Sequence, residues 1–318
     1  MTTADNSEFS LKEFIRSQSS EWPSFADNLD TLGKASVCGK KFALDGYRWV
    51  VNTLTLSYRK ASAKADLAAI ARGERPCFLC LSARPKEQHT HPWRGYEILV
   101  NPYPLGADHL TIPSVAHEPQ RLTQGKVCDM LDLAMILHEN CIFYNGPRCG
   151  ASAPDHFHFQ AVDKQIAHNL SATSLFRIDS LSSAGVSVLV SRPEASPFAF
   201  FALASHSVEK LSEKCMDLLA LLPRMQHEEE PQINLFALAD KPSDKLQMFI
   251  IPRRCHRPSI YGEGEGQLLI SPASLEMAGL FVTPHADHAA MLTADIVRRI
   301  YNEVAFNHDE LRNLCNLK

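Results

Sequence analysis

The sequence lacks a large excess of charge of either sign and lacks any long hydrophobic run. Its 318 residues carry 32 Lys and Arg against 36 Asp and Glu, a net charge of -4. This balance gives no global field that would recruit nucleic acid or an anionic membrane, so an anionic ligand needs a local site. No apolar run approaches the roughly 18 residues that a membrane-spanning helix needs, and the first residues lack the basic and apolar regions of a signal peptide. We therefore expect a cytoplasmic enzyme or binding protein with neither nucleic acid nor membrane as partner.

The sequence also lacks a cysteine framework and a glycine-rich loop suited to phosphate. The nine cysteines are odd in number and spread from Cys38 to Cys315, which favours reduced thiols and metal use over disulfides. The glycine-rich run 262–266 contains acidic residues that would repel a phosphate, so it indicates a flexible loop. The acidic run 228–230 is typical of a solvated loop.

Length and pattern predict an α+β protein of about two domains, at roughly 150 residues per domain. Residues 1–75 are mainly helical and loop-like in pattern, with a helix expected near 61–72, and we treat them as an N-terminal helical extension. Residues 76–170 form the expected catalytic domain and residues 171–318 a C-terminal α+β domain, with the polar stretch 164–174 at the boundary.

The two later domains use similar elements, so we expect two similar halves, although no short-period repeat is present. The first contains two short strands that proline ends and then a helix. Their expected ranges are 97–101, 109–113 and 127–141. In the second half we expect strands at 186–190, 198–204, 233–238 and 247–251, a helix at 208–222, and a final helix through 292–304.

The run from Gly150 to Gln160 contains His156-Phe157-His158-Phe159-Gln160. In an extended strand alternate residues share a face, so His156, His158 and Gln160 are expected to point one way and the two phenylalanines into a core. A neutral imidazole held in this way could attack phosphorus and form a covalent phosphoramidate. An isolated pair of this kind would more often be two core histidines; the flanking residues favour catalysis here.

A possible metal site is indicated by Cys77-Phe-Leu-Cys80, which has the spacing of a thiolate pair that binds one zinc ion. His117 and His156 are the candidates to complete a tetrahedron. His109 competes with His117, and His89 and His91 are also near in sequence. The alternatives are a redox pair or two buried structural thiols.

Four ordered blocks resemble the histidine-triad (HIT) superfamily, in its transferase branch of galactose-1-phosphate uridylyltransferase, diadenosine tetraphosphate phosphorylase and the GDP-hexose phosphorylases. The similarity covers roughly 76–164. The blocks are Cys77-x-x-Cys80, Val100-Asn-Pro-Tyr-Pro with His109-Leu-Thr-Ile-Pro113, His117, and Asn145-Gly-Pro-Arg-Cys-Gly150-Ala-Ser152 followed by His156-x-His158-x-Gln160. The resemblance implies a HIT-like antiparallel sheet with flanking helices in each half.

The same resemblance implies a role for each matched residue. His158 matches the nucleophile that carries a nucleoside monophosphate, and Gln160 the residue that hydrogen-bonds the transferred phosphate. Asn101 matches a ribose-binding position. The loop that surrounds the phosphates is matched by Asn145, Gly150 and Ser152, and the structural zinc ligands of some members by Cys77, Cys80, His117 and His156.

Basic residues are also needed to neutralise phosphate charge. The candidates are Lys164, Arg148 and the group Arg253, Arg254, His256 and Arg257, which follows an apolar strand directly. The segment from Arg253 to Pro258 is similar to one in the GDP-hexose phosphorylases.

Glutamine at position 160 bears on the reaction type, because an amide neither donates a proton to a poor leaving group nor activates water at neutral pH. That suits transfer between phosphates, since a phosphate monoester has its second pKa near 6 and leaves without an acid. We therefore expect a nucleotidyltransferase of the phosphorylase type that acts through a His158 nucleotide adduct. The expected substrate is an NDP-sugar, with GDP-hexose favoured, or a dinucleoside polyphosphate, with phosphate as acceptor.

Two alternatives remain open at this point. One is a nucleotide hydrolase of the same fold, and the other is a zinc-stabilised nucleotide-binding protein without turnover. A homodimer is also open, because active sites shared between subunits occur in the family that the sequence resembles.

Overall fold

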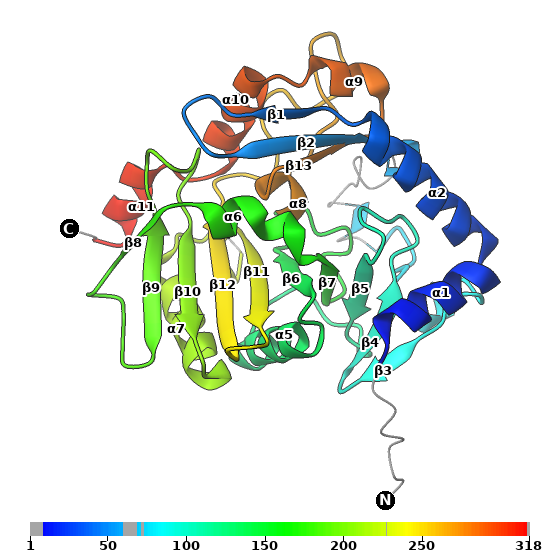
Figure 1. Cartoon of the computed structure of the whole chain (residues 1–318), viewed down its shortest axis with the longest axis horizontal. Helices are drawn as coiled ribbons and strands as arrows, with labels where there is room; N and C mark the ends of the chain where they lie inside the picture. The colour runs from blue at the N-terminus through cyan, green and yellow to red at the C-terminus, as the bar shows by residue number, and fades with distance from the viewer. Residues whose placement is uncertain (1–8, 60–68, 71–72, 227, 317–318) are drawn as a thin grey trace, which may run out of the picture.

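The fold is described from a computed structural model that covers residues 9–59, 69–70, 73–226 and 228–316. Ten strands form one antiparallel sheet that crosses the molecule (Figure 1). In spatial order the strands are β3 (His91–Trp93), β4 (Tyr96–Val100), β5 (Leu110–Pro113), β7 (His158–Asp163), β6 (Asn140–Asn145), β11 (Ile233–Asp240), β12 (Lys245–Pro252), β10 (Phe201–Ser205), β9 (Val186–Ser191) and β8 (Leu175–Arg177).

The sheet consists of two halves with the same element order. In each half three strands are followed by a helix and two more strands, and the last strand inserts between the third and the fourth. The halves meet where β6 pairs with β11, with Asn145 opposite Asn234. The α+β class and the two similar halves are therefore as expected, and one continuous sheet runs through both.

A second, three-stranded sheet joins segments far apart in the chain. It contains β1 (Lys41–Ala43), β2 (Val50–Thr55) and β13 (Leu280–Thr283). Strand β2 pairs antiparallel with β1 and parallel with β13, where Asn52 lies opposite Leu280. The N-terminal region is thus tied to the C-terminal part of the chain.

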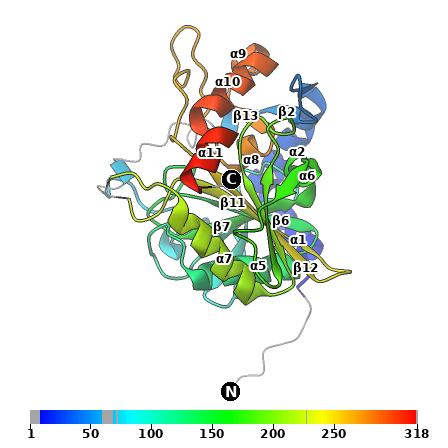
Figure 2. The same ribbon diagram turned by 90° about the vertical axis from the view of Figure 1, so that its left-hand side faces the viewer.

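Helices cover both faces of the large sheet. Helices α5 (Gln124–Ile136) and α7 (Val208–Leu221) lie side by side on one face (Figure 2). Each begins at a hydroxyl residue that accepts a backbone N–H, Thr123 for α5 and Ser207 for α7. The remaining described α-helices lie in the N-terminal region, after β7 and in the C-terminal part of the chain. They are α1 (Leu11–Glu21), α2 (Pro23–Cys38), α6 (His168–Ala172), α8 (Ser274–Met277), α9 (Ala286–Met291), α10 (Ala294–Val304) and α11 (His308–Leu314).

Two hydrophobic cores lie on opposite faces of the large sheet. Successive residues of a strand alternate between the two cores. On β6, Ile142 and Tyr144 belong to the core beneath α5 and α7, while Phe143 belongs to the core beneath the small sheet and α10. This alternation follows from the two-residue repeat of a strand. No helix within the described residues is both long and apolar enough to cross a membrane.

Several expected elements differ from the structure. The helix expected over 127–141 ends at Ile136, and β6 begins at Asn140, because the buried run Cys141-Ile-Phe-Tyr forms a central strand. Strands β1 and β2 were not expected in the N-terminal region, so this region is more than a helical extension. The helix predicted over 61–72 lies largely outside the described residues.

The acidic run 228–230 is not a fully solvated loop. Glu230 is partly buried, and one of its carboxylate oxygens accepts from the Tyr144 hydroxyl at 2.6 Å and the other from the Leu122 N–H at 2.9 Å. Burial raises the pKa of Glu230 to about 7. Glu228 pairs with Arg148 instead.

Candidate active site and metal cluster

Strand β7 carries the candidate catalytic side chains. Phe157 and Phe159 are fully buried in the core beneath α5 and α7, where their rings pack edge to face. His158 and Gln160 point to the opposite face, where both line a cavity of about 1060 Å³, called the large cavity below. His156 lies just before the strand and turns to a separate cluster.

The His158 ring is held in one tautomer and kept neutral. Its Nδ1 donates to the carbonyl of His156 at 2.8 Å, so the lone pair is on Nε2, which has no hydrogen-bond partner among the described residues. Gln120 holds the backbone on both sides, accepting from the His158 N–H at 2.8 Å and donating to its carbonyl at 3.0 Å. Burial lowers the pKa of His158 to about 4. At neutral pH the ring is therefore unprotonated, in the form that can act as a nucleophile.

The large cavity has a mainly apolar and aromatic wall. It is comparable in volume with the largest ordinary small-molecule sites. The wall comes from the N-terminal helices and from the segments that precede β4 and follow it, and includes Trp22, Tyr58, Ile70, Phe78, Leu99 and Tyr103.

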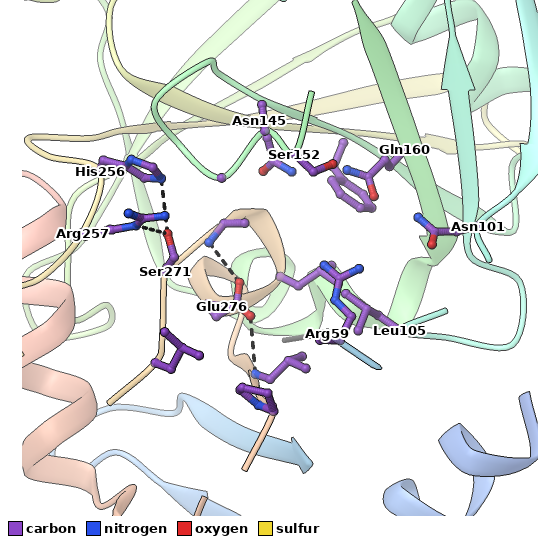
Figure 3. Close-up of a pocket in the computed structure, with 18 residues that line it drawn as sticks. Arg59, Asn101, Leu105, Asn145, Ser152, Gln160, His256, Arg257, Ser271 and Glu276 are labelled. Atoms are coloured by element: carbon purple, nitrogen blue, oxygen red, sulfur yellow. Dashed lines mark hydrogen bonds between the residues drawn. The ribbon is translucent and has the colours of Figure 1, made fainter. Parts of the chain in front are cut away.

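A smaller, polar cavity of about 90 Å³, called the small cavity, is drawn in Figure 3 and shares part of its lining with the large one. Its far wall comes from the C-terminal part of the chain, with His256, Arg257, Ser271 and Glu276. Arg257 Nε donates to the Ser271 hydroxyl at 3.2 Å, and that hydroxyl lies 3.2 Å from His256 Nε2. Four residues line both cavities, and they mark the place where the two meet: Arg59, Asn101, Ser152 and Gln160.

A neighbouring histidine fixes the direction of the Gln160 amide. The Leu105 N–H donates to His109 Nδ1 at 3.0 Å, so the His109 proton is on Nε2. That nitrogen lies 2.9 Å from Gln160 and donates to its Oε1. Burial, together with the positive charge of Arg59, lowers the pKa of His109 to about 3, so this neutral tautomer persists at neutral pH. The Gln160 NH2 group therefore faces away from His109 and has no partner among the described residues.

The loop that follows β6 needs glycine at position 150. Gly150 has φ of +96°, and a Cβ there would lie 2.2 Å from the Cβ of Ala273. This close approach lets the loop of residues 146–152, called the Gly150 loop, pack directly on the start of α8. Gly150 and Ser152 both line the small cavity, as does Asn145 at the end of β6.

Asn101 follows β4 and lies between the two cavities. Its Oδ1 accepts from the Tyr103 N–H at 2.9 Å, and its Nδ2 donates to the Thr111 hydroxyl at 2.9 Å. These two contacts fix the side chain, and it retains a second amide proton for a ligand.

The candidate basic residues lie in different places. Lys164 pairs with Glu139 at 3.0 Å, and Arg254 with Glu310 at 2.6 Å. Arg253 is buried at 3% exposure, and its guanidinium donates to other protein groups. The expectation that these three contact phosphate gains no support, because none of them lines either cavity.

Three polar residues of the small cavity were not singled out from the sequence. Arg59 follows β2, whereas Ser271 and Glu276 lie on either side of the start of α8. No local motif marks them, since tertiary contacts bring them to the site, namely the pairing of β2 with β13 and the packing of α8 on β6 and β11. Of the basic candidates, His256 and Arg257 do line the small cavity.

The expected metal ligands form one cluster. The ligand atoms of Cys77, Cys80, His117 and His156 all lie within 4.8 Å of one another. Cys77 Sγ is 3.3 Å from His156 Nδ1, and Cys80 Sγ is 3.2 Å from His117 Nδ1. Around a tetrahedral zinc ion with bonds of about 2.0–2.3 Å, neighbouring ligand atoms lie about 3.5 Å apart. The four residues could therefore bind a metal ion.

The surroundings of this cluster support metal binding. His156 Nε2 donates to the carbonyl of Ser114 at 2.8 Å, which leaves Nδ1 unprotonated and directed at the cysteines. His109 is not part of the cluster, because it contacts Gln160. Among the other candidates, His89 lies 3.1 Å from Glu21 and His91 stacks on Phe9.

Comparisons with known proteins agree with this fold. A family profile described as a domain of unknown function (DUF4922) matches residues 14–163. No curated protein matches the chain. Crystal structures of yeast Ap4A phosphorylase Apa2 are similar to it at 16% identity. The first superimposes with a TM-score of 0.52, covering 88% of this chain and 94% of the yeast chain. The complex with AMP gives 0.57, with 89% and 97% covered, and the complex with Ap4A gives 0.55, with 87% and 96% covered.

The likeness at this identity shows a shared fold. An Ap4A phosphorylase belongs to the branch that the sequence resembles, so the fold expected from the four blocks is confirmed. The second half, which the blocks hardly cover, is included in the match.

Proposed function

We propose that the protein is a nucleotidyltransferase of the phosphorylase type, with His158 as its nucleophile. The observation that carries the proposal is the state of this one ring. It is neutral, its tautomer is fixed, and its unpartnered Nε2 lies at the wall of a cavity large enough for a nucleotide. The shared fold with yeast Ap4A phosphorylase supports it.

The proposed reaction has two steps. His158 Nε2 attacks the phosphorus that bears the nucleoside, an N–P bond forms, and the P–O bond to the leaving phosphate breaks with its electron pair on that oxygen. The leaving phosphate has its second pKa near 6, so no acid is required. A phosphate oxygen then attacks the adduct, and the N–P bond breaks to return the neutral imidazole. The free NH2 group of Gln160 donates to the phosphoryl oxygens during both steps.

The arrangement of the two cavities suggests where each part of the substrate lies. Attack is in line, so the leaving group lies across the phosphorus from His158. His158 lines the large cavity alone, whereas Gln160 and Ser152 line both. In this proposal the nucleoside occupies the large apolar cavity, and the leaving phosphate lies in the small cavity near Arg257, with the Gly150 loop between them.

The first candidate substrate is a dinucleoside polyphosphate, which the shared fold supports. An NDP-sugar such as a GDP-hexose is the second, and a specific observation favours it. The small cavity contains the Ser271 hydroxyl and the Glu276 carboxylate, groups that can hydrogen-bond sugar hydroxyls. Both substrates have a nucleoside linked through phosphates to a leaving group that departs as a phosphate.

We further propose that the metal is zinc and that its role is structural. Two thiolates and two imidazoles are a donor set typical of closed zinc sites, which keep no position open for water. When bound, the ion would fix His156, whose carbonyl accepts from the His158 ring. Cys77, Cys80, His117 and His156 would hold it.

The first experiment is covalent trapping. Wild-type protein is incubated with a dinucleoside polyphosphate or NDP-sugar labelled at the phosphorus next to the nucleoside, without phosphate, and the label on the protein is counted. We expect label on His158 that added phosphate discharges as a nucleoside diphosphate, and none on His158→Asn. Equal labelling of the two proteins would refute the assignment.

A turnover screen then separates the alternatives. Dinucleoside polyphosphates and ADP-, GDP- and UDP-sugars are compared by kcat/KM with and without phosphate. Strict dependence on phosphate supports a phosphorylase, whereas release of monophosphate in water at the same rate supports a hydrolase. Binding without turnover of any of them would make the protein a binding protein and refute the proposal.

A further inference from the structure

Arg253 is a buried cation that lies behind the Gly150 loop instead of in a cavity. Its Nη1 donates to Asn234 Oδ1 at 2.7 Å, and Asn234 is itself fully buried. The other guanidinium contacts are with backbone carbonyls, at 3.0–3.3 Å, of Val304, Pro272, Cys255 and His256. A guanidinium only donates, so whatever atom of Asn234 faces it must be the oxygen.

This contact sets the direction of the Asn234 amide. With Oδ1 turned to Arg253, Nδ2 points to the Gly150 loop and donates to the Asn145 side chain at 2.9 Å and to the Cys149 carbonyl at 2.8 Å. The atom of Asn145 that receives this proton must be its oxygen. Three buried residues, on β6, on β11 and directly after β12, are thereby connected in one directed chain of hydrogen bonds.

Helix α8 supplies further donors to the same oxygen of Asn145. The Ser274 N–H donates to the same Asn145 oxygen at 2.9 Å, and the Ser274 hydroxyl also contacts it, at 2.7 Å. A backbone N–H cannot accept, so it favours the same direction of the Asn145 amide as Asn234 does. Asn145 Nδ2 is left without a partner among the described residues, at the wall of the small cavity.

Two separate chains of hydrogen bonds, called relays below, therefore orient amide donors at the wall of the small cavity. The His109 ring orients Gln160 from the first half of the sheet, and the Arg253 guanidinium orients Asn145 from the second. Both amides line the small cavity (Figure 3), and neither NH2 group has a hydrogen-bond partner within the described part of the chain. Donors that are oriented in advance lose nothing to rearrangement when an anion arrives.

We propose that Arg253 is a positioning residue for phosphate binding, which acts through Asn234 on the Asn145 amide and does not touch the ligand. This inference rests on the proposed function, because it takes the occupant of the small cavity to be phosphate. It gives the C-terminal half, which carries none of the histidines of the His-x-His strand, a defined part in the site.

The test measures binding of pyrophosphate by titration calorimetry, because this probe needs neither turnover nor a known base. Asn145→Ala removes the donor and is expected to weaken binding about tenfold, as for a lost hydrogen bond to a charged group. Arg253→Lys keeps the charge but loses the planar fork, and weakens binding to a similar extent. Because both act on one contact, the double variant should be no more than about twofold weaker than Asn145→Ala.

Asn234→Asp distinguishes a loss of the hydrogen-bond donor from a loss of folding. It keeps the volume and gives Arg253 an ionic partner, yet it removes the donor to Asn145. The relay predicts pyrophosphate binding about tenfold weaker with the thermal midpoint retained. A merely structural role for Arg253 predicts unchanged binding in this variant. Arg254→Lys, next in sequence and paired with Glu310 at the surface, is the matched control that should bind like wild type.

The outcomes separate the two proposals. Independent effects that multiply to about 100-fold in the double variant, or normal binding by Asn234→Asp, overturn the relay. Wild type that forms the His158 adduct but binds no pyrophosphate also overturns it and leaves the proposed function standing. If the wild-type protein neither forms the His158 adduct nor binds pyrophosphate, both proposals are refuted.

Discussion

The low pKa of His158 predicts how the first step of the reaction depends on pH. The ring is buried at 2% exposure, and this burial lowers its pKa to about 4. The nucleophile is the neutral form, so acid should slow the step only near pH 4. A histidine of ordinary pKa, about 6.5, would lose reactivity far earlier.

The difference is large enough to measure. Between pH 7.5 and pH 5.5, a ring of pKa about 6.5 falls from roughly 90% to 9% neutral, which is a tenfold loss of rate. For a pKa of about 4 the neutral fraction stays above roughly 95%, so the rate should change by less than about a tenth.

The assay is the rate of adduct formation in a single turnover, with no phosphate present. A dinucleoside tetraphosphate or an NDP-sugar suits it, because neither carries a terminal phosphate that would titrate near pH 6. Thermal unfolding at each pH controls for loss of structure. An acid limb with a midpoint between about 6 and 7 would refute the idea that burial keeps this imidazole neutral.

Three further predictions concern the surroundings of the site. His109→Phe, which keeps an aromatic ring near Phe143 but cannot donate to Gln160, should slow adduct formation about tenfold; a wild-type rate would contradict the relay. Removal of the metal by a chelator, or Cys80→Ser, should lower the thermal midpoint by about 5 °C or more. Elemental analysis that finds no zinc in the purified protein would refute the zinc site. Glu230→Gln should raise the free energy of unfolding by roughly 2–3 kcal/mol at pH 8 and leave it unchanged near pH 4, as denaturant titrations at the two pH values would show. The sign follows because the folded-state pKa, about 7, lies above the ordinary 4.5, so folded-state stability is lost as pH rises through 7; equal effects at both pH values would contradict it.

The sequence carried enough information to predict the parts of the site that lie close together in the chain. Residues 145–160 contain the Gly150 loop and the His-x-His strand, and the two-residue repeat alone assigns Phe157 to the core and His158 to the cavity. The metal cluster could also be predicted from the sequence, since Cys77 and Cys80 lie three residues apart. Its two histidines come from the same half of the sheet.

The residues that could not be predicted reach the site through tertiary contacts. Arg59 and Glu276 are separated by most of the chain, and no periodicity relates them. Arg253 was expected at phosphate because basic residues follow an apolar strand there, yet its place in strand pairing turns it inward. The sequence pattern gives the charge, whereas the neighbours decide which way the side chain points.

The parallel pairing of β2 with β13 has a consequence for how the protein is made. Asn52 and Leu280 are partners in this ladder, and most of the chain, including the whole large sheet, lies between them in sequence. On the ribosome, β2 emerges long before its partner β13, and contacts of such sequence separation form late. The small cavity is lined both by Arg59, which follows β2, and by Val282 of β13. A growing polypeptide that lacks β13 therefore has an incomplete cavity. Nascent chains should therefore remain inactive until β13 has been made.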